Sequence, residues 1–270
     1  MNWRAPQTLA VVWPRATARP MTGAVELALA EAVEGSGRAQ TRPERASTVI
    51  AASFDTVDGA ATTPELVRAL GSGVRAWLLC QAALMNGRDP GWYQAQCHDC
   101  GAAYDFQLSL DHMPRGTAGP GYPVVEIATS LGLRRFEAPN GSHEEALAQA
   151  GHFADPRRDL VALLSLAETA LTDADRYSEA DLARIETILD EVTPDIADRI
   201  SATCPECAAV TEAAIDPLSF AFPRAETLLR EAHLIARAYG WREPSILALP
   251  SHRRRAYARL IASDMRGGTR

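Results

Sequence analysis

The sequence predicts an α+β, mainly helical protein with two β-knuckles joined by a four-cysteine zinc site and a helical hairpin at the C-terminus. Three observations predict this fold class. Two Cys-x-x-Cys pairs, Cys97/Cys100 and Cys204/Cys207, are each flanked by short stretches that alternate like strands. Longer stretches with the helical period of about 3.6 residues stand before, between and after the pairs. The chain has 270 residues, of which 47 % are hydrophobic, and this length suffices for a sizeable core.

Residues 1–90 form the first of three expected domains, an α/β region to which the sequence assigns no role. Pro64 suits the first turn of a helix, where its missing N–H costs nothing, and Gly71-Ser72-Gly73 is expected to break or bend that helix. The expected order is a strand at 9–13, a helix at 21–33, a mobile polar loop at 35–46, a strand at 49–52, a helix at 64–86 and a turn at 86–91.

Residues 91–215 form the second expected domain, in which a strand enters and a strand leaves each cysteine pair. Ser142 begins a capping box, and Asp155 and Ser178 are expected to begin two further helices. The expected strands are 92–96, 104–110, 123–128, 133–139, 200–203 and 210–215, and the expected helices are 142–150, 155–166 and 178–192.

The two cysteine pairs predict a structural zinc ion. Each pair can close on one ion with both thiolates, and two pairs supply the four ligands of a closed tetrahedral site. Because 103 residues lie between Cys100 and Cys204, such an ion would join two distant parts of the chain. Gly101 suits the tight turn with positive φ that follows a knuckle, whereas Ala208 stands at the equivalent position of the second pair.

Two other interpretations of the cysteines stay open from the sequence. The pairs could be redox dithiols or unused buried thiols, although redox motifs of the thioredoxin type lie where a strand meets a helix. His98, inside the first pair, could replace one of the thiolates as a ligand. A catalytic zinc is not expected, because four thiolates leave no position for water.

Residues 216–270 form the third expected domain, which is helical. An apolar stripe predicts a helix at 224–239, and Gly240 is expected to end it. A turn at 241–245, a single helical turn at 246–250 and a last helix at 251–265 follow. Arg253, Arg254, Arg255 and Arg259 are expected to give that last helix a basic face.

The composition and charge of the chain argue against several classes of function. The net charge of −7, with arginine as the only basic side chain besides histidine, argues against broad nucleic-acid binding. We find no apolar run that could span a membrane and no signal peptide, and cysteines of this pattern suit a reducing cytoplasm. The histidines and carboxylates form no catalytic spacing, so we expect no enzyme. An enzyme of unknown reaction in the N-terminal half stays as a third, unsupported alternative.

Three motifs near the C-terminus follow one another at a fixed spacing. They are Glu-Ala-His with Tyr-Gly-Trp at 231–241, Ile-Leu-Ala-Leu at 246–249, and Arg-Arg-Arg-Ala-Tyr with Leu-Ile at 253–261. This string resembles the baseplate hub assembly chaperone family of T-even-type contractile-tailed phages and related contractile injection systems. The resemblance covers about residues 216–263, and Cys-Pro-x-Cys extends it to Cys204. Ala208, Ala256 and Ala258 depart from the family pattern, and residues 1–90 carry none of it.

The resemblance implies a non-enzymatic assembly factor or minor structural component of a baseplate hub. Such a protein would act in the cytoplasm of the producing or infected bacterium, or stay in the particle. It would contact hub, spike or wedge proteins. The expected partner-binding residues are Glu231, His233, Tyr239, Trp241, Arg253, Arg254, Arg255, Tyr257 and Arg259. The alternative is a zinc-ribbon nucleic-acid-binding regulator that uses Arg253 to Arg259.

Overall fold

The computed structural model describes residues 7–34, 40–85, 91–150, 155–221 and 224–267, which combine helices with small antiparallel sheets. The first part holds β1 (Ala16–Ala18), α1 (Gly23–Glu34), α2 (Arg42–Ser53), β2 (Phe54–Val57), β3 (Ala60–Ala61), α3 (Pro64–Ala69) and α4 (Ser72–Met85). The middle holds β4 (Gly91–Gln96), β5 (Ala103–Leu108), η1 (Leu110–His112), β6 (Val124–Thr129), β7 (Gly132–Glu137), α5 (Gly141–Ala150), α6 (Pro156–Leu164), α7 (Ala170–Arg176), α8 (Glu179–Val192), β8 (Arg199–Thr203) and β9 (Val210–Ala214). The last part holds η2 (Pro217–Phe220), α9 (Ala225–Tyr239), α10 (Glu243–Leu247) and α11 (Ser251–Gly267).

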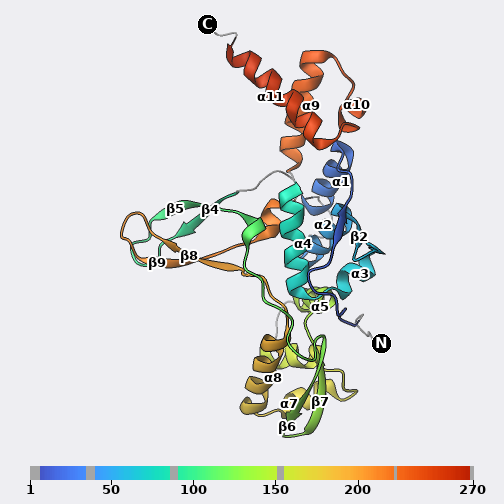
Figure 1. Cartoon of the computed structure of the whole chain (residues 1–270), viewed down its shortest axis with the longest axis vertical. Coiled ribbons are helices and arrows are strands. Elements are labelled where there is room, and N and C mark those ends of the chain that lie inside the picture. Colours follow the sequence, from blue (N-terminus) through green and yellow to red (C-terminus); the bar gives the residue numbers. More distant parts are fainter. Residues whose placement is uncertain (1–6, 35–39, 86–90, 151–154, 222–223, 268–270) are drawn as a thin grey trace.

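The molecule is elongated and has four parts (Figure 1). A central body contains α1 to α4. An arm made of β4, β5, β8 and β9 projects from one side of the body. An insert lobe, built from β6, β7 and α6 to α8, lies at one end, and a C-terminal lobe of α9 to α11 lies at the other.

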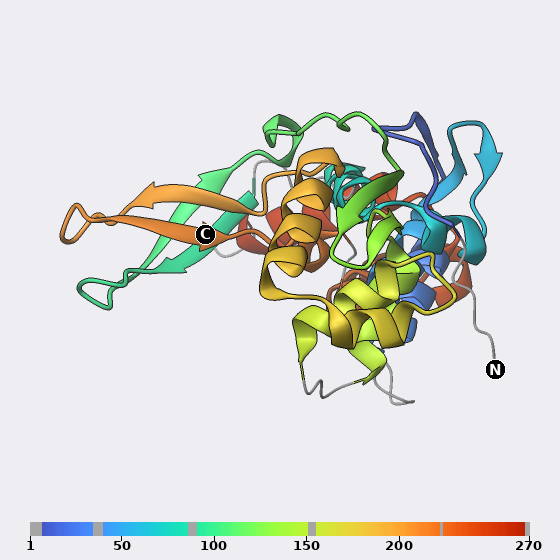
Figure 2. The ribbon, with the colours of Figure 1, turned by 90° about the horizontal axis from the view of Figure 1, so that it is seen from below.

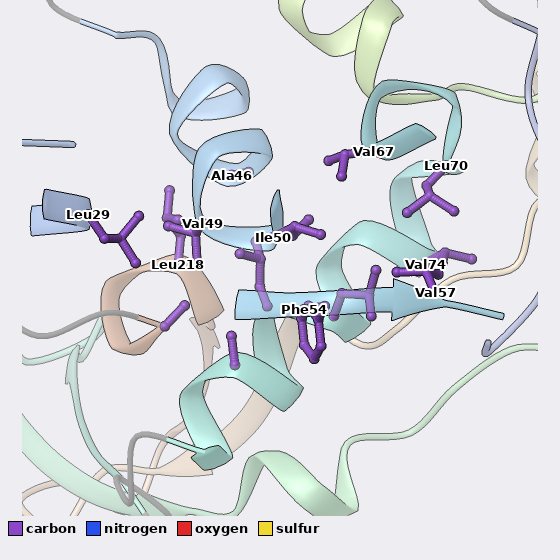
Figure 3. Packing of buried hydrophobic residues seen from close by; sticks show 14 of the residues in the cluster. Leu29, Ala46, Val49, Ile50, Phe54, Val57, Val67, Leu70, Val74 and Leu218 are labelled. Atoms are coloured by element: carbon purple, nitrogen blue, oxygen red, sulfur yellow. The ribbon is translucent and has the colours of Figure 1, made fainter. Parts of the chain in front are cut away.

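The core of the body is formed mainly by α2, α4 and β2 (Figure 3). On α2, the buried residues Ala46, Val49, Ile50 and Ser53 recur at the spacing of one helical face. Far along the chain, η2 returns to α4 and adds Leu218 to the same core. The body is therefore closed by residues from both halves of the sequence.

A buried polar cluster fastens α5 to the body. The guanidinium of Arg75 is almost fully buried and donates hydrogen bonds to Glu144, to the hydroxyl of Ser47 and to the carbonyl oxygens of Val67 and Pro43. Such a charge is tolerated inside a protein only when its donors are satisfied in this way. The cluster therefore fixes how α5, at the end of the insert lobe, sits on the body.

The insert lobe has a separate apolar core between the β6–β7 hairpin and α6 and α8. The two segments that lead into and out of the lobe run side by side. Arg115 and Ile196 form an isolated antiparallel bridge, and the Gly116 N–H donates to the carbonyl oxygen of Asp195. These two segments form one connection of the lobe to the rest of the molecule, and α5, which lies between β7 and α6 in the sequence and contacts α2 and α3, forms another.

Most of the elements expected from the sequence are confirmed. All six strands flanking the cysteine pairs and forming the insert hairpin are present, and so are the helices that begin after Thr63, Asp155 and Ser178. The expected break after α3 is also confirmed. A side chain at Gly73 would collide with the carbonyl oxygen of Pro194, so the chain needs glycine there.

Four expectations within residues 1–150 are wrong. Residues 9–13 form no strand, and Trp13 takes a positive φ of 49°. The expected strand at 49–52 and the last residues of the expected loop at 35–46 belong to α2, because Thr41 and Glu44 form a capping box that starts a helix there. Asn140, and not Ser142, caps α5, because its side-chain oxygen accepts hydrogen bonds from the amides of Ser142 and His143. Residues 35–39 and 86–90 lie outside the described residues.

Candidate metal centre and C-terminal surface

Each Cys-x-x-Cys pair lies at the turn of one hairpin of the arm. β4 pairs with β5 up to Gln96 and Ala103, and β8 pairs with β9 up to Thr203 and Val210. The two hairpins project together, with their turns at the same end (Figure 2). The pairing register therefore brings cysteines from distant parts of the sequence to one tip.

The two turns have the same backbone geometry. The Cys97 N–H donates to the carbonyl oxygen of Ala102 and the Cys204 N–H to that of Ala209, both at 2.9 Å. Gly101 has a φ of 74°, as expected, and Ala208 has a φ of 61° although it carries a side chain. The first Cys of each pair is buried and the second is exposed, so the sulfurs face one another from matched positions.

The four sulfurs lie close enough to hold one metal ion. All of them are within 4.8 Å of one another. Across the two hairpins, the Sγ atoms of Cys97 and Cys207 are 3.6 Å apart, and those of Cys100 and Cys204 are 3.7 Å apart. All four cysteines are free of disulfides. The described residues contain this one group of potential ligands, and His98 is not part of it.

The thiols influence one another strongly. Hydrogen bonds from main-chain amides, first that of Cys100, lower the pKa of Cys97 to about 7. At Cys207 the amide of Ala209 favours the thiolate, but the neighbouring sulfurs of Cys100 and Cys97 outweigh it and raise the pKa to about 12. Four negative sulfurs at such distances repel one another, so a bound cation is what allows all of them to ionise.

The apolar core of the arm is small. Its buried members include Ala95 and Ala213, whose side chains are single methyl groups, and the ring of Tyr104. The hydroxyl groups of Tyr104 and Thr211 share a hydrogen bond that links the two hairpins. Because alanine burial contributes little, the larger side chains Tyr104, Phe106 and Ile200 supply most of the apolar contact in this core.

The expected partner-binding residues separate into an exposed and an interior group. Tyr239, Trp241 and Tyr257 pack against one another at the surface, with ring centroids 5.2 to 5.9 Å apart. Tyr239 and Trp241 remain 46 % and 37 % exposed. His233, Arg253 and Arg259 are also exposed.

Arg254 belongs to the interior group, with only 1 % of its surface exposed. It forms ion pairs with Glu231 on α9, at 2.8 Å, and with Glu26 on α1. Arg255 is half-buried and pairs with the other oxygen of Glu26 at 2.8 Å. The two pairs with Glu26 join the C-terminal lobe to the body, and the pair with Glu231 joins α11 to α9 within the lobe.

Sequence reasoning missed Glu26, the fully buried carboxylate that receives both arginines. The signal was present, because Glu26 lies one helical turn from Leu29 and Ala30 on the buried face of α1. A carboxylate at such a position needs a cationic partner.

Compared with protein-family models, with curated proteins and with solved structures, the chain matches none of them. Within the ranges that the structure describes, no helix is both long enough and apolar enough to span a lipid bilayer.

Proposed function

We propose that the chain is a non-enzymatic assembly factor of a contractile-tail baseplate, in a phage or an injection system. In this proposal the four cysteines hold a structural zinc ion that stiffens the arm as a pair of zinc knuckles. The C-terminal lobe binds a hub, spike or wedge protein. The chain acts as a chaperone or remains as a minor component of the baseplate.

Two features support zinc as the metal. Zinc–sulfur bonds of about 2.3 Å in a tetrahedron place sulfurs about 3.8 Å apart. The cross-hairpin distances of 3.6 and 3.7 Å are close to that value. Four thiolates are also the ligand set typical of structural zinc, and they leave no open position for a reacting water.

The observation that carries the binding role is the exposed aromatic trio of Tyr239, Trp241 and Tyr257. Tyrosine and tryptophan contribute most of the affinity at many protein interfaces, since they offer a large apolar ring with a polar tip. Here the three rings order one another by edge contacts while two of them remain open to solvent. The entropy cost of fixing them on binding is thereby reduced.

The contractile-tail context comes from the resemblance of the C-terminal motifs to the baseplate chaperone family. The aromatic trio belongs to those motifs. Tyr239, Trp241 and Tyr257 are the aromatic members of those motifs. Arg253, exposed on the same helix as Tyr257, offers a guanidinium that can pair with a partner carboxylate. Arg254 and Glu231 instead maintain the lobe.

The test is affinity purification of the tagged protein from its native host, followed by mass spectrometry. We expect hub, spike or wedge proteins to accompany the wild type and to be depleted with Trp241→Ala. Trp92→Ala is the matched control, because Trp92 is a 66 % exposed tryptophan on the arm. Recovery of nucleic acid, or of metabolic enzymes alone, would reject the proposal and favour the regulator or an enzyme.

A further inference from the structure

A groove lies where the C-terminal lobe meets the body, on the other side of α11 from the aromatic trio. Its volume is about 760 Å³. That volume is within the range of sites that accept several side chains of a ligand. The groove is lined by Ala18, Arg19, Met21, Met85, Glu231, Ser251, His252, Arg255, Ala258, Arg259 and Ala262.

The sequence of α11 separates the groove from the aromatic trio. Ser251, Arg255, Ala258 and Ala262 follow at intervals of three or four residues and so share one helical face. Successive residues of a helix are rotated by about 100°, so Tyr257, two positions after Arg255, lies far round the helix. The last helix therefore presents two distinct surfaces.

The charged side chains that line the groove are mainly basic. Arg259 is exposed there. Arg19 forms an ion pair with Asp55, and Arg255 forms one with Glu26. Glu231 is the acidic side chain of the lining, and the buried guanidinium of Arg254 already holds it. Glu26 is fully buried and does not line the groove, so the positive charge of the lining, above all that of exposed Arg259, is what a ligand in the groove meets.

Apolar side chains also line the groove. Met21 and Met85 come from the body, and Ala258 and Ala262 come from α11. Methionine side chains are flexible and polarisable, and they adapt to aliphatic side chains of different shapes. A ligand that fits this mixed lining must therefore combine negative charge with aliphatic groups.

We propose that this groove binds an acidic segment of a partner protein, in which aspartate or glutamate side chains flank leucine, isoleucine or methionine. The carboxylates pair with Arg259, and the aliphatic side chains pack against Met21 and Met85. This binding mode deepens the proposed function, on which it rests for the source of the partner.

Selection of displayed random 12-residue peptides on the full-length, metal-loaded protein tests the groove directly. Enriched peptides would be synthesised, each with a counterpart in which Asp and Glu become Asn and Gln. We expect the enriched peptides to be acidic with aliphatic residues between the charges. We expect Arg259→Glu to weaken their binding about tenfold or more, since it places like charges in contact.

Arg237→Glu is the matched control, because it makes the same charge change at an exposed position on α9 that does not line the groove. Binding to this variant should stay as in the wild type, while Met85→Ser, which removes part of the apolar lining, should weaken it. Peptides without acidic residues, equal binding by the two charge-reversed variants, or no enrichment would each overturn the proposal. If acidic peptides were enriched but no tail proteins came with the protein in the affinity purification, the groove would still bind acidic segments, and the proposed baseplate function would be rejected.

Discussion

Replacement of Cys204 by serine is the sharpest test of the metal centre. Cys204 is buried at the tip of the arm, and its sulfur is 3.7 Å from that of Cys100. Serine keeps the size of the side chain but removes one of the four thiolates. The variant should therefore lose the bound ion while the hydrogen bonds of both hairpins can still form.

The expected loss of stability follows from the length of chain that the ion closes. Cys100 and Cys204 are separated by 104 positions. A cross-link that closes a loop of about 100 residues stabilises a protein by about 4.7 kcal/mol in the chain-entropy model. For a chain of this size, 1 kcal/mol corresponds to about 2–4 °C in Tm, so the expected decrease in Tm is about 10–20 °C.

Three measurements on wild type and variant check this prediction: metal content per chain, thermal unfolding and hydrogen exchange resolved by peptide. We expect one zinc ion in the wild type and none in Cys204→Ser, with faster exchange in β4, β5, β8 and β9. Amides of α4 should stay protected, since that helix lies in the core of the body. Cys80→Ser is the control, because Cys80 is a buried cysteine outside the cluster and its replacement should leave the metal in place.

Two results would refute the reasoning. If Cys204→Ser kept the wild-type Tm after losing its metal, the ion would not be structural. If faster exchange spread equally through α4 and the arm, the ion would not act locally as a brace between the two hairpins.

Three further predictions concern single side chains. Gly101→Ala should lower the free energy of unfolding by about 1 kcal/mol, and Ala208→Gly should raise it by up to about 1 kcal/mol. The reason is that both positions have a positive φ, which glycine adopts without strain. Urea denaturation of the metal-loaded protein measures both changes. Glu26→Gln should destabilise the protein by about 3 kcal/mol or more in the same assay, since it leaves the buried Arg254 with one carboxylate fewer. Hydrogen bonds from Ser130 and then Ser178 hold the pKa of Asp181 well below its usual range. The contribution of Asp181 to stability is therefore present above about pH 4 and is lost as the pH falls further. Asp181→Asn should flatten the plot of unfolding free energy against pH in that range, and an unchanged slope would contradict the assignment.

The sequence predicted the arm well because short-range signals determine it. Alternating strands on both sides of Cys97 and Cys204 implied two hairpins, and the spacing within each pair implied a shared ion. What the sequence did not contain was the face-to-face packing of the hairpins, which depends on contacts such as that between Tyr104 and Thr211. The expectation that the two cysteine pairs lie together therefore depended only on the number of thiolates that a zinc ion needs.

The basic face of α11 shows where sequence reasoning stopped. Arg253, Arg254 and Arg255 are adjacent in sequence, but consecutive residues of a helix point in different directions. One is exposed, one is buried against Glu26, and one reaches the groove. The packing of α11 against α1 and α9 decides which arginine is buried, and the run of three arginines alone does not report that packing.

The strand expected at 49–52 failed for a related reason. Val49 and Ile50 favour strands by intrinsic preference, but the capping box at Thr41 and the spacing to Ala46 and Ser53 fit a helix. Packing of that face against the core decided between the two preferences.

Closure of the body by η2 has a consequence for synthesis of the protein. Leu218 and Ala221 complete a core that otherwise consists of residues before position 83. A ribosome that has made the first half of the chain has therefore not yet made the residues that cover α4. The N-terminal helices must wait, partly uncovered, until well over a hundred further residues have emerged, which makes nascent or truncated chains natural clients for cellular folding factors.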